Sequence, residues 1–404
     1  MANATHDLLV VGGGMVGATF AVAAAHAGLR VALIDREAPA ALQAAPFDGR
    51  ASAIAYSSHR LLATIGVWPH LADHAQAITD IRVSDGESRL FLHFDHRELG
   101  DQPMGFMVEN RFIRRALFAA AAALPTLDLR APATLAALDR GAVLVEATLA
   151  GGARIAAPLA IDASGRNSAL RRQAKIDVVE WTYPQTAIVC TVAHARPHRG
   201  VAHERFLPAG PFAILPLPGD RSSLVWTERQ NLAPAMLALD ERAFAYEMRR
   251  RFGDFLGAVR VEGPRWSYPL AVHHAHRYVD DRLALIGDAA HGIHPIAGQG
   301  VNLGFRDAAA LAEVLVDAMR LGLDLGARPA LETYERWRRF DNTVLIAVTD
   351  SLNRLFANDI APVRLARDLG LATVNEIPPL KRFFMAHARG TVGKLPRLLA
   401  GVAL

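Results

Sequence analysis

The sequence predicts an α/β protein built on a parallel sheet, with a second, mostly antiparallel sheet inserted into it and helices at the C-terminal end. Two short apolar runs, 8–11 and 30–35, flank an Ala-rich helical stretch, and strands that alternate with helices pair in parallel. Between 186 and 226 the pattern changes to short β-type runs broken by Pro and Gly, which is typical of an antiparallel sheet. From 302 onward the chain is mainly helical.

These changes of pattern divide the chain into four segments. We expect a first domain to begin over 1–180, an inserted sheet domain over 181–274, a return to the first domain over 275–330 and a helical region over 331–404. A buried-strand pattern at 283–286 supports the return.

Composition excludes several classes of protein. The 404 residues suffice for two or three structural units. The 44 basic and 40 acidic residues form no long run of like charge, so no nucleic-acid partner is expected. The one cysteine, Cys190, permits neither an intramolecular disulfide nor a cysteine-based metal site, and we expect no metal. Without a spanning apolar run or a signal peptide, we expect a cytoplasmic protein that can rest on the inner membrane.

The first helix is preceded by a glycine-rich turn that matches the pattern G-x-G-x-x-G, Gly12-Gly13-Gly14-Met15-Val16-Gly17. Between a strand and a helix, Gly12 permits the tight turn, Gly14 lets the backbone approach a pyrophosphate, and Gly17 lets the helix pack against the strand. Met15 and Val16 begin the helix, whose free N–H groups and partial positive charge attract phosphate.

Asp35 ends the second strand about 20 residues beyond the turn, and Arg36 follows it. The Asp35 carboxylate would hydrogen-bond the ribose of an ADP group, and an acid there favours FAD or NAD over NADP. This segment does not separate FAD from NAD. The alternative interpretation is a glycine-rich turn that binds no nucleotide.

A second constellation follows the buried strand at 283–286. Asp288 stands at the end of that strand, where its carboxylate could accept hydrogen bonds from sugar hydroxyls, and the helix start near 302 would stabilise a negatively charged ring such as a reduced flavin. The alternative is a structural loop with a capped helix. The residues expected to line a flat ring are Pro295, Gly298, Gln299, Gly300, Val301 and Asn302.

Together these segments resemble the group A flavoprotein monooxygenases, which have the para-hydroxybenzoate hydroxylase fold, and among them the ubiquinone-biosynthesis hydroxylases of the UbiH, UbiF and VisC type. Further blocks carry the resemblance across nearly the whole chain: 48–50, 107–111, 204–211, 267–270 and 367–371. The resemblance implies FAD in the glycine-rich site. It makes 1–180 and 275–330 a Rossmann-like FAD-binding domain and 181–274 the substrate-binding domain.

The resemblance also implies roles for single residues. Arg50 and Arg111 would contact the cofactor, although surface salt bridges are the alternative. Ser164 stands where the family carries Asp, in a segment linked to FAD and NAD(P)H binding. Asp162 lies two residues earlier, on the same face of the preceding strand, and is the candidate to compensate.

The activity implied by the resemblance is hydroxylation of the aromatic ring of a polyprenylated phenol in ubiquinone biosynthesis. O2 would react at FAD to give a flavin hydroperoxide, and NAD(P)H would visit as a transient reductant, since the chain carries no second strand, G-x-G-x-x-G and helix unit. Other ubiquinone-biosynthesis proteins are possible partners. Two alternatives remain: an FAD-dependent reductase of a prenylated substrate, and a non-catalytic flavin-binding assembly subunit, which the Ser164 substitution leaves open.

Three further groups of residues are candidates for function, each with plain packing as the alternative. The inserted sheet would cover the flavin with apolar side chains, Phe212, Ile214, Leu215 and Trp226. The residues nearest the expected flavin could assist proton movement, namely His291, His294 and Gln299. The stretch 379–404 alternates basic and apolar residues, so it would lie on a membrane, dock a partner or pack on the body.

Overall fold

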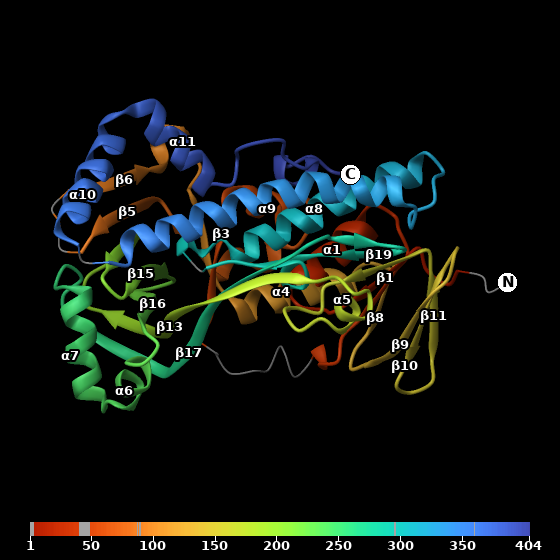
Figure 1. Cartoon of the computed structure of the whole chain (residues 1–404), viewed down its shortest axis with the longest axis horizontal. Coiled ribbons are helices and arrows are strands. Elements are labelled where there is room, and N and C mark those ends of the chain that lie inside the picture. Colours follow the sequence, from red (N-terminus) through yellow and green to blue (C-terminus); the bar gives the residue numbers. More distant parts are fainter. Residues whose placement is uncertain (1–3, 40–48, 87, 89, 295, 359) are drawn as a thin grey trace.

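The computed structural model describes residues 4–39, 49–86, 88, 90–294, 296–358 and 360–404. In this part of the chain a parallel sheet with helices on its faces forms one end of an elongated molecule, and an antiparallel sheet with flanking helices forms the other (Figure 1). The predicted α/β class with an inserted antiparallel sheet is therefore confirmed.

A six-stranded sheet organises the first end, and all its neighbouring pairs are parallel except the pair at one edge. In spatial order its strands are β18 (Val279–Asp280), β19 (Leu283–Leu285), β12 (Leu159–Asp162), β1 (Leu8–Val11), β2 (Val31–Ile34) and β8 (Leu127–Arg130). The central strands β1, β2 and β12 are buried throughout, as expected for a parallel sheet covered on both faces.

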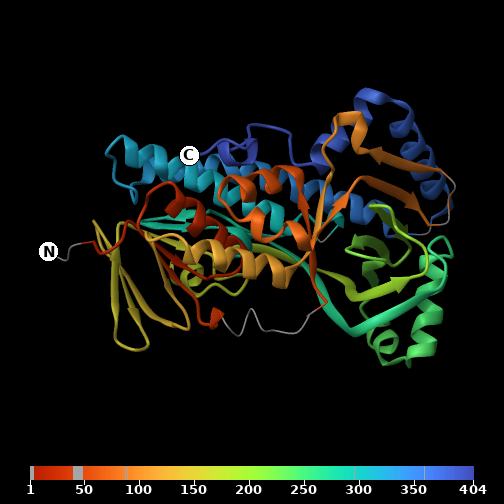
Figure 2. The same ribbon diagram turned by 180° about the vertical axis from the view of Figure 1, so that it is seen from behind.

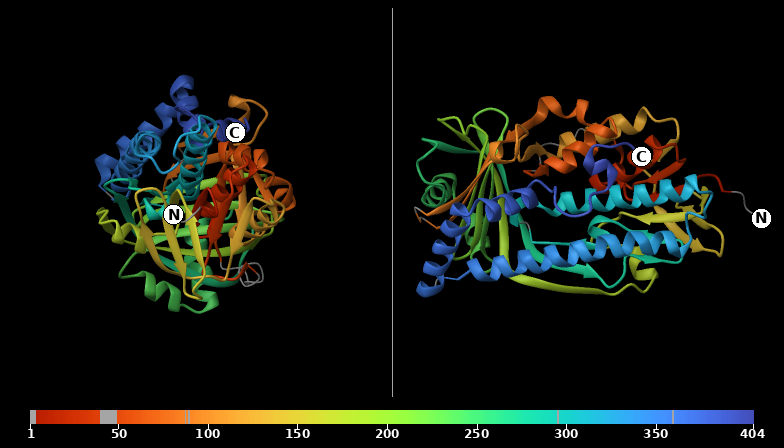
Figure 3. Two further views of the ribbon diagram at one scale, coloured as in Figure 1. Left: turned by 90° about the vertical axis from the view of Figure 1, so that its right-hand side faces the viewer. Right: turned by 90° about the horizontal axis from the view of Figure 1, so that it is seen from above.

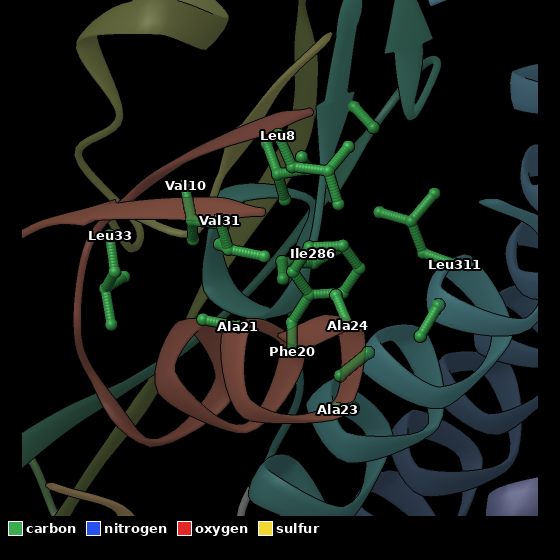
Figure 4. Close-up of a cluster of buried hydrophobic side chains, with 14 of the residues drawn as sticks. Leu8, Val10, Phe20, Ala21, Ala23, Ala24, Val31, Leu33, Ile286 and Leu311 are labelled. Atoms are coloured by element: carbon green, nitrogen blue, oxygen red, sulfur yellow. The ribbon is translucent and has the colours of Figure 1, made fainter. Parts of the chain in front are cut away.

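Five helices share one hydrophobic core with this sheet: α1 (Met15–His26), α3 (Tyr56–Thr64), α4 (Asn110–Ala122), α5 (Ala169–Gln173) and α8 (Gly300–Arg320). Figure 4 shows Phe20 of α1 and Ile286 beside the strands, with Leu311 of α8 across from them. Phe20 and Leu311 are fully buried, and burial of one such side chain contributes roughly 1.5–3 kcal/mol. The glycine-rich turn therefore rests on a rigid base.

Two small antiparallel sheets attach to this end. One consists of β11 (Arg154–Ala157), β10 (Val145–Leu149) and β9 (Leu135–Arg140), and Figure 2 shows it at the opposite end of the molecule from the inserted sheet. The other consists of β3 (Ala51–Ala55), β7 (Gly105–Glu109) and β4 (Ala75–Ile78). Short 3-10 helices complete the connections: 68–70, 72–74, 96–99, 287–289, 296–298 and 397–400.

The eight-stranded sheet at the second end is antiparallel except where β14 pairs with β5. In spatial order it contains β20 (His291–Gly292), β17 (Val259–Ala275), β13 (Val178–His194), β16 (Arg221–Arg229), β15 (Gly210–Leu217), β14 (Val201–Leu207), β5 (Asp80–Asp85) and β6 (Phe91–Asp95). Strands β5 and β6 come from the segment 1–180, so the sheet extends beyond the insertion expected at 181–274. Helices α6 (Ala233–Ala238) and α7 (Glu241–Phe252) pack on one face.

Three helices close the chain: α9 (Arg328–Phe356), α10 (Ala361–Glu376) and α11 (Pro378–Ala388). With 29 residues, α9 is about 44 Å long at 1.5 Å per residue and lies along the length of the molecule (Figure 3). Near its start it packs beside α8, and near its end Asp350 accepts a hydrogen bond from the Tyr183 hydroxyl of β13 (2.6 Å). No helix within the described ranges is long and apolar enough to cross a membrane.

Candidate cofactor and substrate site

A cavity of about 1580 Å³ lies where the two main sheets meet. It begins at the turn before α1, passes Asp288 and the start of α8, and continues along the eight-stranded sheet to α9, α10 and α11. Sites for a single small molecule usually occupy about 300–1000 Å³. This cavity therefore has room for a cofactor and a second ligand together.

The glycines of the glycine-rich turn have different roles. Packing within the protein leaves no room for a side chain at Gly12 or Gly17, whereas it leaves room for one at Gly14. Gly12 has a φ of +105°, and a Cβ there would lie 2.5 Å from the Ala163 oxygen. A Cβ at Gly17 would lie 1.9 Å from the Gly12 oxygen. At Gly14 the backbone is extended, with φ −62° and ψ 178°, and a Cβ would meet nothing within 4 Å. Gly14 borders the cavity, so its missing side chain leaves room for a ligand.

The end of β2 fixes this turn. The Asp35 carboxylate accepts hydrogen bonds from the Gly13 N–H (2.5 Å) and the Glu37 N–H (2.7 Å). Asp35 is half-buried and Arg36 is exposed, and neither lines the cavity itself. A carboxylate has about four acceptor positions, so these bonds leave acceptor positions for the predicted ribose contact.

Asp288 directs a carboxyl group into the cavity. The preceding Gly287 has a φ of +58°, and its N–H donates to Asp307 (3.0 Å), which fixes the turn after β19. Among the described residues no group hydrogen-bonds to the Asp288 carboxyl. Solvent reaches the group through the cavity, yet protein surrounds it closely, and this burial raises its pKa despite the nearby His291 and Arg166. Since no described group takes up the acceptor positions of this carboxyl, the hydroxyls of the FAD ribityl chain fit it.

The start of α8 is fixed against β3 by one side chain. Asn302 accepts a hydrogen bond from the Ala55 N–H (2.9 Å) and donates to the Ala53 oxygen (2.8 Å). Gly298 has a φ of +62°, and a Cβ there would come within 3.1 Å of Ala53. The free N–H groups at this helix start favour an anion in the cavity. Five of the predicted ring-lining residues border the cavity: Gly298, Gln299, Gly300, Val301 and Asn302.

Pro295, also predicted to line the ring, lies outside the described residues. Met15 and Val16 border the cavity beside Gly14, as the prediction for the helix start requires. The side chain of Val16 also packs where a Cβ at Gly287 or Gly304 would lie, within 3.1 Å and 2.3 Å respectively. This packing holds the glycine-rich turn before α1 beside the end of β19, so the two segments border one site.

His291 belongs to a buried polar network that the sequence did not reveal. Its Nε2 lies 2.5 Å from Oδ2 of Asp307, while Oδ1 accepts from Arg338 Nε (2.9 Å) and Asn342 (3.3 Å). Burial alone would raise the pKa of Asp307, but His291 and Arg338 outweigh it and lower the pKa to about 2. His291 borders the cavity, so this network positions its ring.

His294 lies outside the cavity lining. Its ring is fully buried and packs edge-on against Tyr183, with 5.0 Å between centroids. Within the described part of the chain, neither ring nitrogen has a hydrogen-bond partner. Burial lowers the pKa of His294 to about 4, so the ring is neutral at physiological pH.

The two predicted arginines are placed differently. Arg50 lines a side cavity of about 280 Å³, which shares Ala51, Arg166, Val225 and Ile293 with the main cavity. Arg111 lines neither cavity, and its guanidinium donates to Glu109 (2.7 Å). Arg50 therefore borders space beside the main cavity, whereas the Arg111 guanidinium is paired with Glu109 outside both cavities.

The loop that carries Ser164 is held together by Asp162. The buried Asp162 carboxylate accepts from the Ser164 N–H (3.0 Å), from the Ser164 hydroxyl (2.6 Å) and from the Ser168 hydroxyl. Both carboxylate oxygens are therefore engaged inside the loop. Asp162 thus serves the loop itself, and its replacement of the family Asp at 164 stays a prediction.

Three of the four predicted substrate contacts point away from the cavity. Phe212, Ile214 and Trp226 are fully buried beneath α6 and α7 on the far face of the sheet, because alternate residues of a strand face opposite sides. Leu215 does border the cavity. The residues next to Phe212, Ile214 and Trp226 along the strands border the cavity in their place. These are Pro211, Ala213, Val225 and Thr227.

Comparisons with known proteins agree with this geometry. Residues 5–343 match the family model described as an FAD binding domain. Ubiquinone hydroxylase UbiL of Rhodospirillum rubrum is 56% identical over 100% of this chain and 94% of that protein. The 3-demethoxyubiquinol 3-hydroxylase of Escherichia coli is 36% identical over 96% of this chain and 100% of that protein. The structure of p-nitrophenol 4-monooxygenase PnpA from Pseudomonas putida has the same fold, with a TM-score of 0.81, 18% identity, and coverage of 98% of this chain and 100% of that chain.

The fold, the glycine-rich turn and the cavity define an FAD-dependent flavoprotein monooxygenase. Within that class, the chain belongs to the family of ubiquinone-biosynthesis hydroxylases, as the resemblance of its motifs predicted. FAD as the cofactor is thereby confirmed.

Proposed function

We propose that this protein hydroxylates the ring of a phenol that carries a polyprenyl tail, with O2 as oxygen source and NAD(P)H as transient reductant. The observation that carries the proposal is the length and apolar lining of the cavity beyond the start of α8. There the cavity is bordered by Val344 and Val348 of α9, by Leu371 of α10 and by Phe384 of α11. A polyprenyl chain is long and apolar, so this lining suits it by the hydrophobic effect. The names of the relatives, which are hydroxylases of ubiquinone or its precursors, support the same substrate class.

Different segments of the chain would bind different parts of FAD. The turn at Gly14 leaves room for the pyrophosphate, Asp288 would accept hydrogen bonds from the ribityl hydroxyls, and the start of α8 would favour negative charge on the ring. FAD supplies the activation of O2 and the transfer of one oxygen atom to the substrate ring. The apolar sheet face, with Ala213, Leu215 and Val225, would exclude water from the reacting ring.

One experiment separates this proposal from its rivals. Purified, FAD-loaded protein would be supplied with NADH or NADPH and 2-farnesylphenol, and O2 consumption and hydroxylated product would be measured together. We expect one product molecule for each O2 consumed. Conversion of the substrate without O2 consumption would indicate a reductase instead, and failure of NAD(P)H to reduce the flavin would indicate a non-catalytic subunit.

Val348→Asp is expected to weaken the binding of a long tail selectively. Val348 borders the cavity and is 46% exposed, so the fold should tolerate the change. Each buried CH2 contributes about 0.8 kcal/mol, so loss of contact with two groups would raise KM for 2-farnesylphenol about tenfold. KM for 2-prenylphenol should change little, which steady-state kinetics would show. Leu321→Asp, at a residue 74% exposed outside the cavity lining, is the matched control, and equal effects on both phenols would contradict the prediction.

We further propose that α11 rests on a membrane surface. Phe383 and Phe384 are 51% and 41% exposed and also border the cavity, beside the exposed Arg382. Buried Met385 holds the opposite side of the helix against the body. Apolar side chains beside a cation suit an anionic lipid surface, which could deliver a polyprenylated substrate to the cavity.

Phe383→Asp should reduce co-sedimentation with vesicles of phosphatidylglycerol and phosphatidylcholine several-fold. One aromatic side chain contributes roughly 1.5–3 kcal/mol when it leaves water, and the new carboxylate is repelled by anionic lipid. Tyr246→Asp, at an exposed residue of α7, is the control and should leave sedimentation unchanged. Equal sedimentation of all three proteins would exclude a role for α11.

A further inference from the structure

Glu204 contributes a carboxyl group to a largely apolar part of the cavity wall. It lies on β14, and its cross-strand partners are Ala213 of β15 and Val83 of β5. The residues two positions away on the same face of β14, Ala202 and Phe206, are both buried. All five residues border the cavity.

Packing brings the strand that carries this carboxyl against the turn before α8, where the flavin ring is expected. Phe206 and its neighbour Val83 pack against Ile296, which belongs to the turn at 296–298 just before α8. Ala53, which approaches Gly298 of that turn, packs in the same cluster as Val83. The sheet around Glu204 therefore meets the turn that would line the ring.

No described residue hydrogen-bonds to the Glu204 side chain or forms an ion pair with it. Glu204 is half-buried and borders the cavity, so its carboxyl lacks a protein partner at a place where a ligand could supply one. Burial alone raises the pKa of Glu204 to about 8. Perturbed groups of this kind cluster at functional sites.

Charged groups on the neighbouring elements have other partners. On β14, Arg205 donates to the Arg251 oxygen (2.9 Å) and His203 packs its ring on Phe255 (4.6 Å between centroids). On β5 and α10, Asp85 and Arg367 form a buried ion pair with 2.7 Å between Oδ2 and Nε. Strand β15 carries no ionisable side chain. The titration of Glu204 is thus governed by its apolar surroundings.

We propose that Glu204 is a catalytic residue that accepts the proton of the substrate's ring hydroxyl. In this step the phenol O–H bond breaks, its electron pair stays on the phenol oxygen, and the proton forms an O–H bond with the Glu204 carboxylate. No electrons pass between the two groups. The resulting phenolate pushes electron density into the ring, which makes the ring a better acceptor of an electrophilic oxygen. An unperturbed phenol has a pKa near 10, so a base that titrates near 8 is well matched to it.

This inference rests on the proposed phenol hydroxylation, and kinetics test both. With FAD-loaded enzyme and 2-farnesylphenol, we expect the hydroxylation rate to rise with pH about a midpoint near 8, because the carboxylate is the reactive form. Glu204→Gln should lower the rate by about 10²-fold or more and remove this limb of the pH profile. Glu204→Asp should keep the limb at a reduced rate. Anaerobic reduction of the flavin by NAD(P)H should be unchanged in both variants, which shows that the cofactor site is intact.

A spectroscopic measurement tests contact without turnover. The infrared difference between native protein and Glu204→Gln should contain a protonated-carboxyl band that disappears near pH 8 and shifts when 2-farnesylphenol binds. Glu180→Gln, on an exposed part of β13 in the same sheet, is the control and should lack such a band. The inference would be overturned, and the proposed function left standing, by either of two results. One is a hydroxylation rate of Glu204→Gln within a few-fold of native at every pH, and the other is a carboxyl band that does not shift when the phenol binds. Native enzyme that hydroxylates no phenol would instead overturn the proposed function, and this inference with it.

Discussion

Gly14→Val is expected to give a folded protein that binds FAD about 10–100-fold more weakly and is purified largely colourless. A Cβ at Gly14 meets nothing within 4 Å, and the extended backbone there suits valine. The added methyl groups would instead enter the space predicted for the pyrophosphate. Overfilling a close-packed site costs roughly 1–3 kcal/mol, which corresponds to this loss of affinity. Flavin absorbance for each protein molecule and a fluorescence titration with FAD would measure it.

Two other glycines provide the controls. Gly151→Val adds the same side chain at an exposed turn with open space around it, and should leave FAD binding unchanged. Gly17→Ala places a Cβ 1.9 Å from a backbone oxygen, so this variant should lose stability as well as flavin. Full flavin content in Gly14→Val would show that the pyrophosphate binds elsewhere.

Asp307→Ala should lower the free energy of unfolding by about 3–5 kcal/mol, the usual cost of removing one partner from a buried ion pair. Asp307 is fully buried and joins His291, Arg338 and the N–H of Gly287. Its loss would leave the buried Arg338 with Asp341 as its only carboxylate partner among the described residues and would release the turn that carries Asp288. Urea unfolding at pH 7 would measure the change, and flavin retention should fall in parallel.

The exposed pair of Asp281 and Arg328, with 3.4 Å between atoms, gives the contrast. Surface pairs contribute about 0–1 kcal/mol, so Asp281→Ala should stay within that range. Because the pKa of Asp307 is lowered to about 2 from an ordinary 3.8, its stabilising contribution is complete above about pH 4 and is lost as the pH falls toward 2. Equal destabilisation by the two variants would contradict the importance of the buried network.

The sequence predicted the first part of the site because its signals are local. The strand at 8–11, the turn at 12–17 and the helix after it form one continuous unit, in which Gly12 and Gly17 are required sterically by the protein's own packing. The start of α8 was predicted for the same reason. The addition of β5 and β6 to the second sheet was not predictable in this way, because pairing with β14 joins residues more than 100 positions apart.

Two kinds of site residue escaped sequence reasoning. Alternation within a strand shows that Phe212 and Leu215 face opposite sides, yet only the position of α6 and α7 decides which side is core and which is cavity. Asp307 carries no motif, and its signal is only an acid within the apolar stretch of α8. Glu204 gives a similar signal, an acid between Ala202 and Phe206 on one face of β14.

The long helix α9 limits how the molecule can move. Its Arg338 is fixed to the first end through Asp307, and its Phe356 stacks on Phe206 of β14 with 4.0 Å between centroids. The 17-residue strands β13 and β17 span the same junction. A hinge concentrates rotation in a few residues, but here any rotation between the ends would have to bend a helix and two strands at once. Ligands would therefore enter and leave through small shifts of side chains and helix ends, while α9, β13 and β17 keep the two ends of the molecule in place.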